Sequence, residues 1–217
     1  MSPWLTRLVL DPRHRGIRAL LADGGRQHTW LMQLAPSSLG DTPRRTAGLL
    51  YRIDDGQREP EILVQTAAEP LLDALPADGV LHAATRKLAP LLDALHTGGT
   101  VRYRITANPT KRWGNSAPEP ALVGRLHTHR GPAAIDWWTE RAAAAGLGVH
   151  TVDWRPLDDT VVARARHARA RFEGTATITD PGILRDAVTS GIGRSQSYGC
   201  GLLSLALLTD ADRQGTG

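Results

Sequence analysis

The sequence near the C-terminus reads SGIGRSQSYGCGLLSLALL over residues 190–208. Four of the eleven residues from 191 to 201 are glycine, and an apolar, strand-like run follows directly. Such a backbone must bend sharply and approach another group closely. Because glycine alternates with serine, glutamine and Arg194, the loop offers exposed N–H groups and a guanidinium, which suit a phosphate. Composition alone also allows a simpler alternative, a flexible loop that leads into a buried strand.

Two familiar nucleotide-binding loops do not fit this stretch. A P-loop requires Gly-Lys-Ser/Thr at the start of a helix, and the loop holds no lysine. A dinucleotide-binding turn requires a third glycine three residues after the second, where Gln196 stands, and a helix must follow it. The loop therefore predicts a phosphate contact of another kind.

The composition is that of a soluble globular protein, with 41% hydrophobic and 22% charged residues in a chain of 217. This length can hold one large domain or two of about 100 residues each. The sequence has no apolar run of about 18 residues, and its N-terminus does not show a basic segment followed by an apolar one. We therefore expect neither a membrane span nor a signal peptide. Cys200 is the only cysteine, so an internal disulfide is excluded and a reducing compartment, the cytoplasm, is expected.

Positive charge is concentrated in two windows of the sequence. Residues 101–130 carry a net charge of +5 and residues 160–172 carry +4, whereas the whole chain carries only +4. The remainder must therefore be net negative. A basic surface restricted to two segments is typical of a protein that binds a polyanion such as nucleic acid. Nearly all of this charge is arginine, which contacts phosphate in a bidentate way and stacks on bases, although GC-rich coding would give the same bias.

Apolar spacing and turn residues predict the order βαββαβ twice. The first set consists of a strand at 4–10, helices at 14–22 and 26–34, strands at 47–53 and 61–66, a helix at 84–95 and a strand at 100–106. The second set consists of a weak strand at 121–128, a helix at 132–147, a strand at 149–154, a strand pair at 160–178, a helix at 181–190 and the final strand.

A Gly-, Asn-, Ser- and Pro-rich link after residue 107 marks the expected boundary between the two sets. We therefore predict an α+β protein of two tandem ferredoxin-like, RRM-like domains. The domains are expected at residues 1–107 and 120–208, and residues 209–217 are expected to form a disordered tail.

Several strings in the chain resemble the CasE family of CRISPR proteins, which belongs to the RAMP superfamily of RNA-binding proteins. The glycine loop and its strand carry the most specific match, GIGxxxSxGCGLLSLA at 191–206. Further similar strings are WLTRLVL at 4–10, VQTxxEP at 64–70, RYRITANPTKR at 102–112, the helix around Trp137-Trp138 and RFEG at 171–174. The similarity therefore extends over nearly the whole chain.

This resemblance implies the tandem ferredoxin-like fold and the activity of the CRISPR precursor-RNA endoribonuclease of the type I-E Cascade complex. Such an enzyme cuts the repeat RNA at the base of its hairpin without a metal or another cofactor. It leaves a 5′-hydroxyl and a cyclic or 3′ phosphate. It then stays bound to the mature guide RNA together with the other Cascade subunits.

His28 is the expected catalytic histidine, because the active-site histidine of the family falls at this position. Imidazole titrates near neutral pH, so it can accept the proton of a 2′-hydroxyl or protonate the departing 5′ oxygen. The tyrosine that the family has three residues earlier is Gly25 here, and Tyr198 in the glycine loop is the expected substitute. Two other departures, Gln196 for lysine and Arg194 for proline, indicate that the charge of the loop has moved by two positions.

The RNA-binding residues are expected in the two basic windows and in the glycine loop. They are Arg104, Lys111, Arg112, Arg164, Arg166, Arg169, Arg171, Gly191, Gly193, Arg194, Ser195 and Gln196. In a strand, the arginines of 164–171 form two pairs that each share a face, and a turn or bulge at His167-Ala168 would align the pairs. The alternative for these arginines is a solvated strand face.

His127-Thr128-His129 is the one pattern that suggests a metal, but no cysteine or nearby carboxylate completes a ligand shell, so no metal is expected. Two other functions remain open. One is a subunit of the same fold that binds CRISPR RNA without cutting it, which the missing tyrosine at position 25 would allow. The other is a tandem-ferredoxin protein that binds a small acidic ligand, which would leave both basic windows unexplained.

Overall fold

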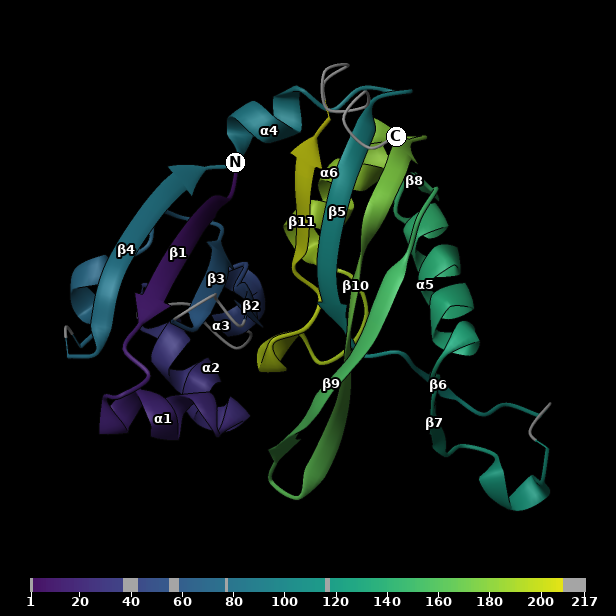
Figure 1. The fold of residues 1–217 in the computed structure, drawn as a ribbon, viewed down its shortest axis with the longest axis horizontal. Coiled ribbons are helices and arrows are strands. Elements are labelled where there is room, and N and C mark those ends of the chain that lie inside the picture. The colour runs from purple at the N-terminus through teal and green to yellow at the C-terminus, as the bar shows by residue number, and fades with distance from the viewer. Residues whose placement is uncertain (1, 37–42, 55–58, 77, 116–117, 209–217) are drawn as a thin grey trace.

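The computed structural model describes residues 2–36, 43–54, 59–76, 78–115 and 118–208, so the predicted tail at 209–217 lies outside the described residues. Two antiparallel sheets stand side by side, and the second is covered on its outer side by helix α5 (Figure 1). Within the described residues, no helix combines the length and the apolar character that crossing a membrane requires. The predicted α+β fold with two ferredoxin-like units is confirmed.

The first sheet has the strand order β2-β3-β1-β4. Its part of the chain consists of β1 (Trp4–Leu10), α1 (Arg15–Leu21), α2 (Gly24–Met32), α3 (Pro43–Thr46), β2 (Leu50–Asp54), β3 (Glu61–Thr66), the 3₁₀ turn η1 (Leu72–Ala74) and β4 (Val80–Lys87). Leu8 of β1 pairs with Ile62 of β3, and both belong with Leu31 of α2 to one buried cluster. The alternation of apolar residues in β1 predicted this inward face.

The second sheet has the order β11-β5-β10-β8, and β9 pairs with β10 beside it. Its part of the chain consists of α4 (Ala89–Asp93), β5 (Thr100–Ala107), β6 (Thr110–Arg112), η2 (Pro120–Leu122), β7 (Leu126–Thr128), α5 (Pro132–Ala144), β8 (Leu147–Val149), β9 (Asp153–Val162), β10 (Ala165–Ile178), α6 (Pro181–Ser190), η3 (Gln196–Tyr198) and β11 (Leu203–Leu207). Trp138 of α5 stacks on Phe172 with ring centroids 5.6 Å apart. The tryptophans of α5 are therefore core residues.

The predicted helix at 84–95 is wrong in its first part. Residues 80–87 form the edge strand β4, whose side chains are exposed or only partly buried. This strand lacks the apolar alternation that marks a half-buried strand, so its sequence gave no strand signal. The leucines that suggested a helix follow it around the short α4, and Leu92 and Leu95 pack into the core of the second sheet.

Strand β5 was predicted to complete the first sheet, but it lies in the second sheet between β11 and β10. There β5 is the first strand, a place for which the sequence predicted a strand at 121–128. Of those residues, only the three of β7 form a strand, and β7 pairs with β6 in a separate two-stranded sheet. Strand β4 replaces β5 as the last strand of the first set, where the 3₁₀ turn η1 stands in place of the second helix. The second set keeps the βαββαβ order, with β5 as its first strand and β11 as its last. A division of the chain by sheets thus falls between β4 and β5, ahead of the boundary expected after residue 107.

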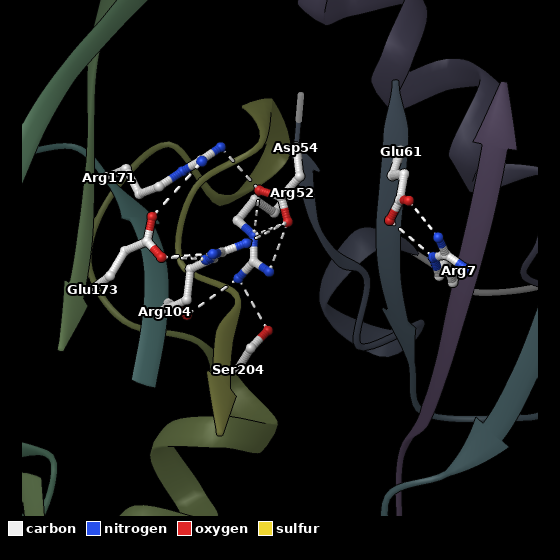
Figure 2. Close-up of polar contacts among 8 residues, drawn as sticks. All are labelled: Arg7, Arg52, Asp54, Glu61, Arg104, Arg171, Glu173 and Ser204. Atoms are coloured by element: carbon white, nitrogen blue, oxygen red, sulfur yellow. Dashed lines mark hydrogen bonds and ion pairs between the residues drawn. The ribbon is translucent and has the colours of Figure 1, made fainter. Parts of the chain in front are cut away.

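A cluster of charged side chains joins the two sheets (Figure 2). Asp54, at the end of β2, accepts hydrogen bonds from Arg52 Nε at 2.9 Å and from Arg171 Nη2 at 3.1 Å. Arg104 Nη1 lies 3.7 Å from the same carboxylate, and Arg104 Nη2 lies 2.6 Å from Glu173. Only 3% of the Arg52 side chain and 6% of the Arg171 side chain are exposed. These buried pairs fix how β2 meets β5 and β10.

Arg171 was predicted to contact RNA, but the structure places it inside this cluster. Its guanidinium faces Asp54 and Glu173 and is almost fully buried, so it is not available to a phosphate. Arg104, another predicted RNA contact, belongs to the same cluster but keeps 43% of its side chain exposed. The pattern along β10 could not reveal that β2, more than 100 residues away in the chain, brings a carboxylate to this face.

Candidate functional site

The glycine loop, residues 191–201, turns between α6 and β11 through left-handed backbone conformations. The angle φ is positive at Gly191, Gly193, Ser195, Gly199 and Gly201. Two of these glycines are also required by close packing: a Cβ on Gly191 would lie 2.7 Å from Leu50 Cδ2, and one on Gly201 would lie 3.0 Å from the carbonyl oxygen of Ile192. The sharp bend and close approach predicted from the glycine spacing are confirmed.

A cavity of about 640 Å³ opens beside the glycine loop. Its wall consists of Arg44, Asn108, Thr110, Leu126, Thr128, Asp159, residues 165–168 and residues 193–198. The loop forms one side, the β9–β10 hairpin a second and the β6–β7 pair a third. Figure 1 shows that the hairpin extends past the end of its sheet. Both basic windows of the sequence therefore border the same cavity.

The wall of this cavity is suited to an anion. Arg44, Arg166 and Arg194 contribute guanidinium groups, and Asp159 is the only acidic residue that the described wall contains. Asp159 lies 3.2 Å from Arg166, which leaves two arginines without a carboxylate from the wall. The backbone N–H groups of residues 193–195 donate no hydrogen bond to any described part of the chain. Free N–H groups beside left-handed turns form the kind of concavity that binds phosphate.

Helix α2 packs against both the hairpin and the loop. A Cβ on Gly24 would lie 2.3 Å from Thr160 Cγ2, so glycine is what allows α2 to approach β9 this closely. The hydroxyl of Tyr51 lies 3.3 Å from Gln27 Oε1 on α2 and 3.2 Å from the carbonyl oxygen of Ser197 in η3. These contacts place α2 next to the cavity.

His28 lies on α2, one turn after Gly24, and its side chain is partly buried. Its Nδ1 is buried and has no hydrogen-bond partner among the described residues. Burial, and then the positive charge of Arg44, lower the pKa of His28 from its ordinary value of 6.5. The imidazole is therefore neutral at pH 7 and able to accept a proton. His28 is not in the cavity wall, but Arg44 both lines the cavity and acts on His28.

Replacing Arg44 by alanine should raise the pKa of His28, because a positive charge that disfavours the imidazolium is removed. The rise should be partial, since burial, the larger cause, remains. An NMR titration of the His28 ring protons measures this, with Arg45→Ala as the matched control of equal charge. An unchanged His28 titration in Arg44→Ala, or an equal shift in Arg45→Ala, would contradict this assignment.

Tyr198, the predicted second catalytic residue, stands in the cavity wall, with its ring centroid 4.5 Å from that of His167. Nδ1 of His167 lies 3.0 Å from Ser195 Oγ, and Asn108 Nδ2 donates to the same oxygen at 2.8 Å. The predicted bulge at His167-Ala168 is confirmed, because the register between β9 and β10 shifts between His167 and Arg169. Thus the structure brings Tyr198 together with an imidazole, although a different one from His28.

The wall also contains residues that the sequence did not predict to be functional, among them His167, Arg44 and Asn108. The bulge was the only signal near His167, and Asn108 lies within the string at 102–112 that carried part of the family resemblance. Arg44 gave no signal because it lies in the four-residue helix α3, outside both basic windows. Gln196, where the family has lysine, donates from its side chain to the carbonyl oxygen of Ser190 at 3.2 Å and so closes the loop.

The other predicted RNA-binding residues lie at the edge of the cavity. Arg164 occupies the exposed hairpin turn with a φ of 69°. Arg169 donates from Nε to the carbonyl oxygen of Asp158 at 2.8 Å, which holds it along the hairpin. Lys111 and Arg112 are exposed on β6, next to the wall. Arg164, Arg169, Lys111 and Arg112 therefore lie on the two segments that border the cavity, whereas Arg104 and Arg171 belong to the charged cluster between the sheets.

His127 and His129 stand on or beside β7 with ring centroids 5.1 Å apart, and His127 packs against Trp113 at 5.0 Å. Within the described ranges, no group of three or more histidine, cysteine or acidic residues is placed to hold a metal ion. Cys200 is a buried free thiol, and burial raises its pKa to about 12. It is therefore protonated and unreactive at neutral pH.

Comparison with known proteins places the chain in a family. The profile of a family described as "CRISPR associated protein" matches residues 3–206. The chain belongs to this family. A curated relative, the CRISPR-associated endoribonuclease Cse3 of Thermus thermophilus, is 30% identical over 222 residues, which cover 94% of this chain and 99% of the relative. The Cascade subunit CasE of Escherichia coli is 29% identical over 202 residues, which cover 88% and 96%.

A solved structure is similar over the same extent. Thermus thermophilus Cse3, bound to an RNA that represents a pre-cleavage complex, matches with a TM-score of 0.78 and 28% identity, covering 95% of this chain and all of that chain. The similarity thus includes both sheets, the glycine loop and the hairpin of this CRISPR-associated protein. The resemblance seen in the sequence is confirmed.

Proposed function

We propose that this CRISPR-associated protein is an endoribonuclease that cleaves repeat stem-loops in CRISPR precursor RNA and then stays bound to the guide RNA as a Cascade subunit. The proposal rests mainly on the arginine-lined cavity, which has free backbone N–H groups in its wall and the neutral imidazole of His28 beside it. The chain is also similar over 94% of its length to an endoribonuclease. The free thiol of Cys200 fits a cytoplasmic location.

The proposed reaction is attack of a ribose 2′-hydroxyl on the adjacent phosphorus. The new bond joins O2′ to phosphorus, the bond from phosphorus to O5′ breaks, and the products are a 2′,3′-cyclic phosphate and a 5′-hydroxyl. His28 accepts the proton of the 2′-hydroxyl, for which a neutral imidazole is required. Arg44, Arg194 and the N–H groups of residues 193–195 stabilise the charge that develops on the phosphate oxygens.

This chemistry needs proton transfer and positive charge, both of which side chains supply, so we expect no metal requirement. The test is incubation of the purified protein with its repeat stem-loop in excess EDTA. A single cut at the base of the hairpin supports the proposal, and no cut with or without magnesium would favour a subunit that binds CRISPR RNA without cleaving it. We include the non-cleaving outcome because Gly25 stands where the family has a tyrosine.

The RNA stem is expected to lie along the β9–β10 hairpin, where Arg164 and Arg166 are exposed. We expect the double variant Arg164→Gly, Arg166→Ala to weaken stem-loop binding and to reduce the slope of log affinity against log salt by up to about 2, since each lost phosphate contact removes a little less than one unit. Glycine is chosen at position 164 because φ is positive there. Filter binding at several salt concentrations gives the slope.

The matched control removes two exposed arginines outside both basic windows, Arg15 on α1 and Arg86 on β4. It lowers the net charge by the same amount, so it separates a local contact from a general charge effect. Equal salt slopes for the two double variants would remove the hairpin from the RNA surface.

A further inference from the structure

The cavity holds an imidazole to which the mechanism above gives no role. His167 lies on β10 at the bulge, in the cavity wall, and the ring of Tyr198 packs against it at 4.5 Å. Its Nδ1 is fixed by Ser195 Oγ at 3.0 Å, and Ser195 is in turn held by Asn108. Three separate segments, the end of β5, the hairpin and the glycine loop, therefore combine to hold this one ring.

We propose that His167 is the second proton-transfer group of the cleavage reaction, the acid that protonates the departing 5′ oxygen while His28 accepts the 2′-hydroxyl proton. This inference rests on the proposed cleavage function and goes beyond it by naming the acid. The proton balance is complete: one proton passes from the 2′-hydroxyl to His28, and another passes from His167 to O5′. Solvent exchange then restores both rings.

The contacts leave one nitrogen of His167 free for this role. No hydrogen bond from the described part of the chain reaches Nε2, and the ring lines the cavity, so Nε2 is the nitrogen available to RNA. Nδ1 keeps its partner in both protonation states, because the Ser195 hydroxyl can accept from a protonated Nδ1 or donate to an unprotonated one. The ring can therefore give up a proton without losing its orientation.

The charged groups around His167 also fit a site that receives a phosphate. Arg44 and Arg194 line the same cavity, and Arg166 and Asp159 pair with each other on the hairpin. Arg169, on the same strand, is held by the carbonyl oxygen of Asp158. These guanidinium groups give the wall beside His167 the positive charge that holds a phosphodiester there.

Tyr198, expected from the sequence as the substitute for the missing family tyrosine, has a different role in this proposal. Its ring packs on the imidazole and holds it in place, so Tyr198 is a positioning residue. An imidazole titrates closer to neutral pH than a phenol does, so it is the better proton donor at pH 7. We therefore expect Tyr198→Phe to keep most of the activity, because it keeps the ring.

The test compares two RNA stem-loops in single-turnover cleavage by the full chain. One has the natural 5′ oxygen at the scissile phosphate, and the other has sulfur in its place, which leaves as a thiolate without needing a proton. We expect His167→Ala to slow cleavage of the natural RNA by about 10²–10⁴-fold. On the sulfur substrate, the cleavage rate of His167→Ala should be within about tenfold of the wild-type rate. His28→Ala should cleave both substrates slowly, because it lacks the group that accepts the 2′-hydroxyl proton.

His167→Gln serves as the second variant, because glutamine can keep a hydrogen bond to Ser195 but cannot act as an acid. It should behave like His167→Ala, whereas a purely structural role would be rescued by glutamine. The proposal is overturned if His167→Ala cuts natural RNA at the wild-type rate, or if it is equally slow on both substrates. A wild type that cuts neither RNA would instead overturn the proposed function, and this inference with it.

Discussion

Replacing His28 by alanine is expected to lower the rate of single-turnover stem-loop cleavage by about 10²–10⁴-fold, the usual effect of losing one positioned proton-transfer group. Stem-loop affinity should stay within a few-fold of wild type, because binding is spread over arginines of the hairpin and the loop. The two quantities are measured on the same labelled RNA, cleavage with enzyme in excess and affinity with a non-cleavable 2′-deoxy substrate.

His82→Ala is the matched control, since His82 is exposed on β4 in the first sheet, away from the described cavity wall. It should cut at the wild-type rate. A His28→Ala variant that cleaves as fast as wild type would remove His28 from the chemistry. A parallel loss of affinity and rate would make it a binding residue.

Asp54→Ala is expected to have the largest effect on stability, a loss of about 3–5 kcal/mol in the free energy of unfolding. The substitution leaves the buried guanidinium groups of Arg52 and Arg171 without the carboxylate that both contact. Burying a charge without its partner is costly, because the charge has lost its water as well. Asp54→Asn should lose less, since its amide oxygen still accepts hydrogen bonds. Urea unfolding followed by circular dichroism gives these values.

The Arg7–Glu61 pair provides the control for Asp54, and Figure 2 shows the two arrangements together. Arg7 Nε donates to Glu61 at 2.8 Å, but 48% of the Arg7 side chain is exposed, so water replaces the lost contact. Arg7→Ala should therefore change the urea midpoint only slightly. If it destabilises the protein as much as Asp54→Ala does, the buried cluster does not hold the sheets together as described.

Much of the fold follows from local patterns in the sequence. Strand β1 was predicted with the bounds that the structure shows, and the start of α5 was predicted from Pro132. The helix ends at Ala144, three residues before the predicted end, because Leu147 already belongs to β8. Strand β4 was missed because an exposed edge has no apolar face to reveal it. Strand β5 was predicted correctly as a strand but assigned to the wrong sheet, because pairing with β10 and β11 depends on residues about 70 and 100 positions away.

For the candidate site too, some features could be predicted from the sequence and others could not. The glycine loop was recognisable because positive φ angles and close packing demand glycine at fixed positions. The neighbours of each side chain could not be predicted, because they come from distant segments of the chain. Asp54 accepts a hydrogen bond from Arg171, and Asn108 donates one to Ser195. For the same reason, the packing of the His167 ring against the Tyr198 ring could not be predicted from either segment alone.

In the proposed mechanism, this protein cuts RNA by 2′-hydroxyl attack at the cavity beside the glycine loop. The most direct measurement compares single-turnover cleavage of the natural repeat stem-loop with that of one carrying a single 2′-deoxy nucleotide at the scissile position, both in EDTA. The proposed mechanism predicts a 2′,3′-cyclic phosphate and a 5′-hydroxyl from the natural RNA and no cutting of the 2′-deoxy RNA. Cleavage that survives the 2′-deoxy substitution, or products with a 5′-phosphate, would contradict it.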